Sequence, residues 1–296
     1  MSPPRRVLVA GGTGMLGRPV VRRLLEDGFS VRVLARSPQK ARSLLPGAVE
    51  VASGDLARPQ TLEEACRDCS ALYVSVDTPP GPGFHPETEG LRNLAEAAKR
   101  SGKPRLVILS ALGSSDPANA EHRWWHAREK HLAQRIARES GLPWTILEPT
   151  WLMESLPLFV RGKTFYWFSD ASLSAHWIAG DDLGRLLSAA LIKGSGQGEV
   201  IAVQGPKKLT MLEAASAFIA AYDPQIQVKT VPLWTFRVLG LFKSEAKELV
   251  SLLDCYSGLD EPAPAESVWR RFARPTMDVA DYARYCRRTG DFPQKG

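Results

Sequence analysis

A glycine-rich turn near the N-terminus constrains the fold more than any other stretch of the chain. The sequence "VLVAGGTGMLGRPVVRRLLEDG" covers residues 7–28 and places Gly11, Gly14 and Gly17 at intervals of three. The apolar residues before the glycines predict a buried strand, and the amphipathic stretch after them predicts a helix that ends at Gly28. A strand, a glycine turn and a helix in this order open the dinucleotide-binding unit of α/β proteins.

The spacing of the glycines has a physical reason. Without side chains, Gly11 and Gly12 let the backbone turn tightly and approach a pyrophosphate, while Gly17 lets the helix lie close to the strand. The N-terminus of that helix then faces the negative charge. We therefore predict that this turn binds a dinucleotide through Gly11, Thr13, Gly14, Met15, Leu16 and Gly17. The alternative is a turn with a structural role only.

The first half of the chain alternates apolar, β-branched runs with longer helical patterns. We predict strands at 5–10, 30–35, 48–52, 71–76, 105–110 and 144–149, and helices at 15–27, 38–45, 60–68, 86–101 and 122–140. Such alternation predicts right-handed βαβ units and a parallel sheet with helices on both faces. Residues 1–150 are thus expected to form an α/β Rossmann core with a doubly wound parallel sheet.

Residues 151–296 are expected to form a smaller, mostly helical region on the substrate side. Within it, a helix at 180–193 and a strand at 198–205 return the segment 180–205 to the core. A helix at 210–222 begins with a capping box of Thr210 and Glu213. The remainder, to about residue 290, predicts short helices interrupted by a Pro-rich loop at 260–266.

Charge and hydropathy exclude some classes of protein. The formal net charge is +6, from 38 Lys and Arg against 32 Asp and Glu. These basic residues are scattered along the chain, which argues against a nucleic-acid partner. No apolar run has the ~18–20 residues of a membrane span, and the N-terminus has no signal-peptide pattern. We expect a cytoplasmic protein.

Cysteine spacing raises one further question. Cys66 and Cys69 have the C-x-x-C spacing of a zinc half-site or a redox pair, but Cys255 and Cys286 do not form a second pair. We predict two ordinary thiols near a helix end and no metal site.

The end of the second predicted strand carries a signal for the type of dinucleotide. NAD-binding proteins hold the ribose 2′-hydroxyl there with a carboxylate, whereas this chain has Ala35 followed by Arg36, with Lys40 one helical turn further on. A guanidinium suits a 2′-phosphate, so we predict NADP(H) in preference to NAD(H). A solvated surface arginine is the alternative. After the third strand, Asp55 and Leu56 are predicted at the adenine, although Asp55 could equally cap the next helix.

Several segments together resemble a known family. "GGTGMLG", "VRVLARSPQKAR", "GDLARPQTLEEAC", "RLVILSALG", "HAREKHLAQRIARESGLPWTILEPTWLME" and "HWIAGDDLGRLLSAAL" occur in this order between residues 5 and 205. Their combination resembles the NmrA-like, atypical short-chain dehydrogenases/reductases. The resemblance implies a Rossmann domain that binds NAD(P) and a C-terminal region that shapes the substrate cleft. It also implies either reduction of quinones and aromatic compounds or redox sensing without catalysis.

The chain departs from this superfamily at the catalytic positions. Where its enzymes carry Tyr-x-x-x-Lys, the sequence is "HAREK", so His126 takes the place of the tyrosine and Lys130 is retained. The resemblance implies that Lys130 holds the nicotinamide ribose, and that Lys130 or His126 supplies a proton. Ser110 is the candidate for the active-site serine, but Ala111 stands where many relatives have a second serine.

Other segments keep two interpretations each. The tryptophans between 124 and 177 either line a pocket for a flat aromatic substrate or belong to a core or partner surface. His176 and Trp177 belong, by the resemblance, to the substrate side, and Asp181 or Asp182 is expected to cap a helix. The loop 78–90 is either a lid over the cofactor or a long connection.

Two functions follow from these observations. The first is an NADPH-dependent reductase of a small quinone, carbonyl or unsaturated aromatic compound, without the usual tyrosine. The second is a non-enzymatic sensor that binds NADP(H) and a protein partner, without turnover. Retained Lys130 favours the enzyme, and the missing tyrosine favours the sensor. A homodimer is compatible with either.

Overall fold

The protein divides into two compact units. The computed structural model describes residues 5–121, 124–168, 174–256, 261 and 266–290. The first unit comprises Met1–Pro149, Leu183–Val203 and Arg270–Ala273, and the second comprises Thr150–Asp182, Gln204–Trp269 and Arg274–Gly296. Each unit has its own secondary structure and its own buried core.

Within its described residues, the first unit is built on a seven-stranded sheet whose paired strands are all parallel. The strand order β10-β6-β5-β4-β1-β2-β3 is that of a doubly wound Rossmann sheet, extended by one strand. The strands are β1 (Arg6–Ala10), β2 (Ser30–Ala35), β3 (Glu50–Ser53), β4 (Ala71–Val74), β5 (Arg105–Leu109), β6 (Trp144–Pro149) and β10 (Glu199–Val203). The predicted fold class is confirmed.

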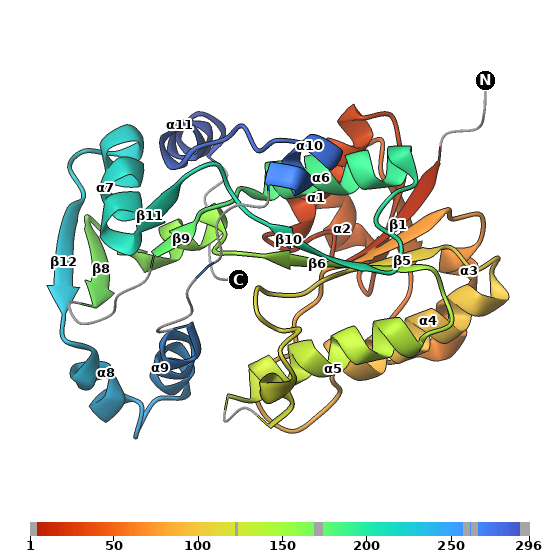
Figure 1. The fold of residues 1–296 in the computed structure, drawn as a ribbon, viewed down its shortest axis with the longest axis horizontal. Coiled ribbons are helices and arrows are strands. Elements are labelled where there is room, and N and C mark those ends of the chain that lie inside the picture. The colour runs from red at the N-terminus through yellow and green to blue at the C-terminus, as the bar shows by residue number, and fades with distance from the viewer. Residues whose placement is uncertain (1–4, 122–123, 169–173, 257–260, 262–265, 291–296) are drawn as a thin grey trace. The chain divides into compact units, whose positions relative to one another are not determined.

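Helices cover this sheet on both faces. Alternate residues of each strand point to opposite faces, and because both sets are apolar, both faces are buried under helices. Figure 1 shows α4 and α5 along one face, with α1 and α6 on the other. Leu8 of β1 belongs to the core beneath α4 and α5, whereas its neighbours Val7 and Val9 are buried on the opposite side. The helices are α1 (Gly17–Glu26), α2 (Pro38–Leu44), α3 (Glu63–Cys66), α4 (Leu91–Arg100), α5 (Trp125–Glu139) and α6 (Gly180–Lys193).

The second unit contains helices and, within its described residues, two small sheets. One sheet has the order β12-β8-β7 and the other pairs β11 with β9. The elements are β7 (Val160–Arg161), β8 (Thr164–Phe168), β9 (Ser174–His176), β11 (Lys208–Thr210), α7 (Met211–Tyr222), β12 (Gln227–Val231), α8 (Leu233–Leu239), α9 (Ser244–Tyr256), α10 (Glu266–Arg271) and α11 (Val279–Thr289). Its core gathers Met153, Phe165, Trp167, Trp177 and Phe218.

Two sequence-based expectations for this part of the chain have different outcomes. The capping box of Thr210 and Glu213 at the start of α7 is confirmed. The prediction of helices alone after residue 222 is wrong at 227–231, because these residues form β12, which pairs in parallel with β8. Apart from Glu261 and Glu266, the Pro-rich segment 260–266 lies outside the described residues.

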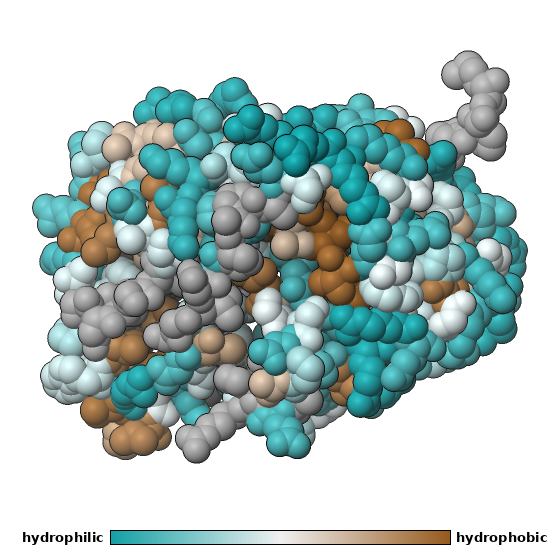
Figure 2. Space-filling view, in the orientation of Figure 1, coloured by the Kyte–Doolittle hydropathy of each residue, from teal (hydrophilic) through white to brown (hydrophobic). Residues whose placement is uncertain are grey.

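Apolar side chains are exposed on part of the second unit's surface. Trp234 of α8 is 62% exposed, and Leu241 and Phe242 in the following turn are 78% and 82% exposed. The brown patch at the lower left of Figure 2 lies over this segment. Exposed apolar groups of this size are typical of surfaces that contact other molecules.

Candidate cofactor-binding and active site

A cleft of about 920 Å³ lies at the carboxyl ends of the strands of the first unit. Ala10, Ala35 and Leu109 border it at the last residues of β1, β2 and β5, and Gly54 and Ser75 follow β3 and β4. Ligands of open α/β sheets bind at this edge, where the strand order reverses.

The glycine turn after β1 is shaped by close backbone contacts. Gly11 has φ +87°, and a Cβ atom there would lie 1.9 Å from the carbonyl oxygen of Ser75. A Cβ on Gly17 would lie 2.1 Å from the carbonyl oxygen of Gly11. The Gly14 N–H donates to the Gly11 carbonyl at 3.0 Å and closes the turn. Glycine is therefore required at positions 11 and 17.

This turn leads directly into α1, which begins at Gly17. The N–H groups in the first turn of an α-helix have no carbonyl partner within the helix, and they carry the positive end of its dipole. A backbone cradle beside a helix N-terminus fits a pyrophosphate. The structure thus has the features that a dinucleotide requires at this place.

The residues that the sequence assigned to the cofactor lie together. All eleven of them line this one cleft: Gly11, Thr13, Gly14, Met15, Leu16, Gly17, Arg36, Lys40, Asp55, Leu56 and Lys130. Arg36 follows β2 directly, and Lys40 lies in the first turn of α2; both side chains are exposed. The planar guanidinium of an exposed arginine at this strand end can donate several N–H groups to a 2′-phosphate.

Asp55 has a different local role from a helix cap. Its Oδ1 accepts a hydrogen bond from the Ala57 N–H at 3.0 Å, which closes a turn before the short 3₁₀ helix at Pro59–Thr61. The Asp55 N–H donates to Thr61 Oγ1 at 3.0 Å. These bonds fix the Asp55 carboxylate at the wall of the cleft.

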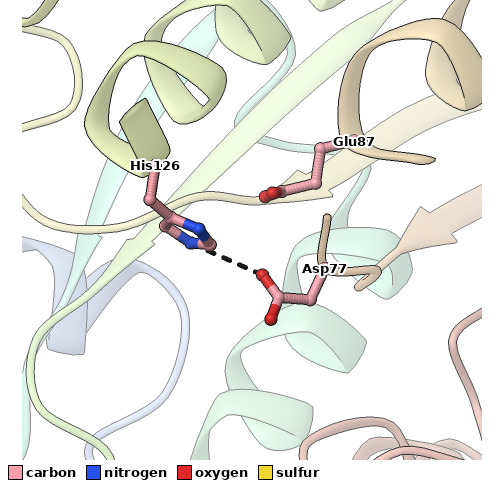
Figure 3. Close-up of side chains that lie close together, drawn as sticks. All are labelled: Asp77, Glu87 and His126. Atoms are coloured by element: carbon pink, nitrogen blue, oxygen red, sulfur yellow. Dashed lines mark ion pairs between the residues drawn. The ribbon is translucent and has the colours of Figure 1, made fainter. Parts of the chain in front are cut away.

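Charged side chains form a second part of the cleft wall, around Lys130 and Asp77. Helix α5 carries His126 and Lys130 one turn apart, as predicted. Lys130 Nζ lies 2.5 Å from Glu87 Oε1, and His126 Nε2 lies 3.4 Å from Asp77 Oδ1. Figure 3 shows that His126 and the two carboxylates converge from three separate segments. Lys130 and Asp77 thus line the cleft, and Glu87 and His126 are their respective partners.

These groups have the geometry of a possible cation site, but their partners argue for another role. One ligand atom each from Asp77, Glu87 and His126 lies within 4.8 Å of the others. However, Glu87 contacts the Lys130 ammonium through one oxygen and accepts from the Thr78 N–H through the other. An ammonium in contact with Glu87 repels a metal ion, so we interpret the cluster as two paired contacts, Lys130 with Glu87 and His126 with Asp77.

Asp77 differs from an ordinary surface aspartate. Its side chain stands in the cleft and is largely exposed, but the surrounding protein displaces enough water to raise the pKa of its carboxyl above the usual value. Nearby Glu87 adds to this effect, while His126 and Lys130 oppose it. Asp77 is therefore more readily protonated than an ordinary aspartate.

Ser110 belongs to a buried hydrogen-bond network. Its side chain accepts a hydrogen bond from Gln134 Nε2 at 2.8 Å, and the same nitrogen donates to Glu148 Oε1 at 2.6 Å. Ser110 is 5% exposed, and its neighbour Leu109 lines the cleft. Ser110 thus contributes to the packing between β5, α5 and β6.

The remaining candidates of the first unit are buried thiols. Cys66 ends α3 and Cys69 follows it, and both are buried. Burial raises the pKa of the Cys66 thiol to about 12, whereas reactive dithiols need a lowered pKa. These cysteines therefore have the character of core residues.

In the second unit, the candidate residues serve mainly its core. Trp167 and Trp177 are 1% exposed each. The His176 N–H donates to Glu261 Oε2 at 2.6 Å, and both residues are buried. Helix α6 begins at Gly180, so Asp181 and Asp182 lie in its first turn rather than at the cap. The Asp182 carboxylate instead accepts from the N–H groups of Thr276 and Met277.

Sequence reasoning missed the carboxylates beside Lys130. Glu87 lies in a short π-helical turn, Pro86–Gly90, at the start of the helix predicted for 86–101. Asp77 directly precedes the loop 78–90, which lines the cleft through Pro79, Phe84 and Pro86. The sequence signal was a Pro- and Gly-rich segment after the fourth strand, which is common in connections without function.

Comparison with known proteins adds to this geometry. Residues 11–193 match a family model described as NAD(P)H-binding. The chain is 28% identical over 290 residues to the NAD(P)H azoreductase of Xenophilus azovorans, covering 94% of this chain and 96% of that protein.

Two solved structures have a similar fold. One is the NADPH-dependent quinone oxidoreductase QOR2 of Escherichia coli in complex with NADPH, with a TM-score of 0.73, 18% identity and coverage of 94% of this chain and 99% of that chain. The other is NmrA, a negative transcriptional regulator, with a TM-score of 0.69, 17% identity and coverage of 95% of each chain. At these identities the comparison establishes the fold.

Among the described residues, no helix is both long and apolar enough to cross a membrane.

Proposed function

The chain belongs to the NAD(P)H-binding family, in line with its resemblance to NmrA-like proteins, and from this premise we propose that it is an NADPH-dependent reductase. The proposed substrate is a small quinone, carbonyl or unsaturated aromatic compound. The likeness to an azoreductase over nearly the whole chain supports an aromatic substrate.

The observation that carries this proposal is the position of Lys130. Its side chain lines the same cleft as the glycine turn, and its ammonium is paired with Glu87. A protein that only binds a dinucleotide needs the phosphate cradle. A reductase also needs an oriented cation and a proton donor at the reacting ring, and Lys130 and the His126–Asp77 pair can fill these roles.

The preference for NADPH follows from Arg36. We propose that its guanidinium, with Ser37 and Lys40 beside it on the cleft wall, binds the 2′-phosphate of the adenosine ribose. A planar fork of donors matches phosphate oxygens and gives a charge-assisted bond.

In the proposed reaction, different residues of the chain would bind the cofactor and supply the proton. Bound NADPH supplies the hydride. The glycine turn and α1 would hold its phosphates, and Lys130 would hold its nicotinamide ribose. Lys130 or His126 delivers the proton that the reduced substrate takes up, and Asp77 exchanges protons between His126 and solvent.

The test is a titration followed by a turnover assay. The protein should bind NADPH and NADP⁺ more tightly than NADH and NAD⁺ in calorimetry. It should then consume NADPH with a quinone or an azo dye. Lys130→Met should lower kcat by about 100-fold, because it removes both the ribose contact and a proton source.

Lys99→Met is the matched control. Lys99 lies on α4 and pairs with Glu96, and that variant should keep wild-type turnover. The proposal fails if NADPH binds but neither a quinone nor an azo dye is reduced, or if the Lys130 variant is as active as the control.

A redox sensor without turnover is the second candidate. It is favoured by one observation: Ser110, the candidate catalytic serine, is buried and hydrogen-bonded to Gln134, in a chain with His126 in place of the tyrosine. A sensor should bind NADPH and NADP⁺ with clearly different affinities and reduce no substrate. Equal affinities with turnover would exclude it.

A further inference from the structure

The ion pair between Glu87 and Lys130 is buried, unlike a surface ion pair. The Glu87 side chain is 4% exposed and that of Lys130 is 14% exposed, with 2.5 Å between Oε1 and Nζ. Removing a carboxylate and an ammonium from water is costly, and each would be strongly unfavourable without the other. The pair therefore restricts Lys130, whose long side chain otherwise samples many rotamers.

Glu87 is itself fixed from both sides. The Thr78 N–H donates to Glu87 Oε2 at 3.2 Å, and the Glu87 N–H donates to Thr78 Oγ1 at 3.3 Å. This reciprocal pair joins the two ends of the loop whose middle lines the cleft. The Glu87 carboxylate consequently has a set direction, which points its free oxygen at α5.

A second set of contacts holds the same turn against α5. Thr88 Oγ1 donates to Glu129 Oε2 at 3.0 Å, and His85 Nδ1 lies 3.1 Å from Glu129 Oε1. Attachment of the turn to α5 is thus provided by Glu129, the residue next to Lys130. The Glu87–Lys130 contact is not needed for attachment alone, and this separates a role in positioning from a role in packing.

We propose, on the basis of the function proposed above, that Glu87 is a positioning residue for that reaction. It holds the Lys130 ammonium in the cleft at the place where the nicotinamide ribose binds. Glu87 acts through Lys130, with no contact of its own to the cofactor. Preorganisation of this kind lowers the cost of reaching the reactive geometry and so affects turnover more than substrate binding.

A double-mutant cycle tests this proposal. The proteins are the wild type, Glu87→Gln, Lys130→Met and the double variant, with Glu129→Gln as the matched control. Glu87→Gln should lower kcat for quinone reduction by about tenfold and change the KM for the quinone by less than about twofold. In the Lys130→Met background, the same substitution should change kcat by less than about twofold. Glu129→Gln should keep kcat within about twofold of the wild type.

Two results would overturn it. One is a loss on Glu87→Gln that persists in full without Lys130, and the other is an equal loss in Glu129→Gln; either would mean that Glu87 only holds the loop. If Glu87→Gln does not fold, Glu87→Asp replaces it. That variant keeps the negative charge but moves it away from the Lys130 ammonium by the length of one methylene. A folded Glu87→Asp protein with unchanged kcat would equally contradict the positioning role.

Failure of the proposed function gives a different result. If the wild-type protein reduces neither a quinone nor an azo dye, the reductase proposal fails, and the cycle is measured on NADPH dissociation constants instead. If the effect of Glu87→Gln on the NADPH dissociation constant differs by at least about fivefold between the wild-type and Lys130→Met backgrounds, the positioning role is supported. If the effects of the two substitutions on this constant are additive, the positioning role is overturned.

Discussion

Two parts of the cleft are built in different ways. At the glycine turn, the backbone makes the binding surface: Gly11 and Gly17 leave no room for a Cβ atom, and α1 begins directly behind them. Around Lys130, side chains from three segments make the surface, through the pairs Lys130–Glu87 and His126–Asp77.

This difference has a consequence for the effect of mutations. The part of the cleft that is formed by backbone should lose its binding surface entirely when one glycine gains a side chain, because the peptide units cannot move independently of the strands. A part built from side chains can lose one contact and keep the others. The predictions below should separate these two behaviours.

The largest effect is expected for Gly11→Ala. Its Cβ would lie 1.9 Å from the Ser75 carbonyl oxygen, so the end of β1 or β4 must shift. We expect NADPH binding to weaken by at least about 100-fold, and the free energy of unfolding to fall by about 3 kcal/mol. Calorimetric titration and thermal unfolding measure these two changes.

Gly28→Ala is the control for backbone strain alone. Gly28 has φ +83°, close to that of Gly11, and a Cβ there would meet no atom within 4 Å. This variant should lose about 1 kcal/mol of stability and keep its affinity for NADPH. If both variants bind NADPH equally well, the turn does not bind phosphates.

A more selective effect is expected for Arg36→Ala at the adenosine side of the cleft. Loss of the guanidinium should weaken NADPH binding by about 10-fold to 100-fold and leave NADH binding unchanged, since only NADPH carries the 2′-phosphate. Arg42→Ala, an exposed arginine in the last turn of α2, is the control and should change neither affinity. An equal loss for both dinucleotides would place Arg36 elsewhere on the cofactor.

The same contrast explains what the sequence could predict of the site. The glycine turn, Arg36 and the His126–Lys130 pair are local patterns: a strand end, a spacing of three, one turn of helix. The partners Glu87 and Asp77 belong to a connection far from α5 in sequence. Their contacts with α5 depend on the fold of the loop 78–90, which has no periodic pattern to read.

The fold itself was predictable to a different degree in the two units. Strands β1, β4 and β5 are continuous apolar runs, as buried parallel strands must be, and the sequence locates them well. Strand β12 reads "QVKTV" and is mostly exposed, so no hydrophobic pattern distinguishes it. Its pairing with β8 decides its structure, and a single-sequence pattern does not contain that partner.

The smallest expected effect concerns Asp77 and pH. Because the pKa of its carboxyl is raised, Asp77 becomes neutral at a higher pH than an ordinary aspartate as the solution is acidified. NADPH is an anion, so loss of this negative charge on the cleft wall should tighten its binding. The affinity of the wild-type protein should therefore rise as pH falls, by about two- to threefold, since solvent screens an exposed charge.

In Asp77→Asn the charge is absent at every pH, so this part of the pH dependence should disappear. The other charged or titratable groups around Asp77 are His126 and Lys130, which lower the pKa of its carboxyl, and Glu87, which raises it. The variant His126→Asn removes the imidazole and leaves the contribution of Asp77. Calorimetric titration of the three proteins over the acidic range separates the two groups. A pH dependence that survives in Asp77→Asn but vanishes in His126→Asn would assign the proton exchange in this part of the cleft to the imidazole alone.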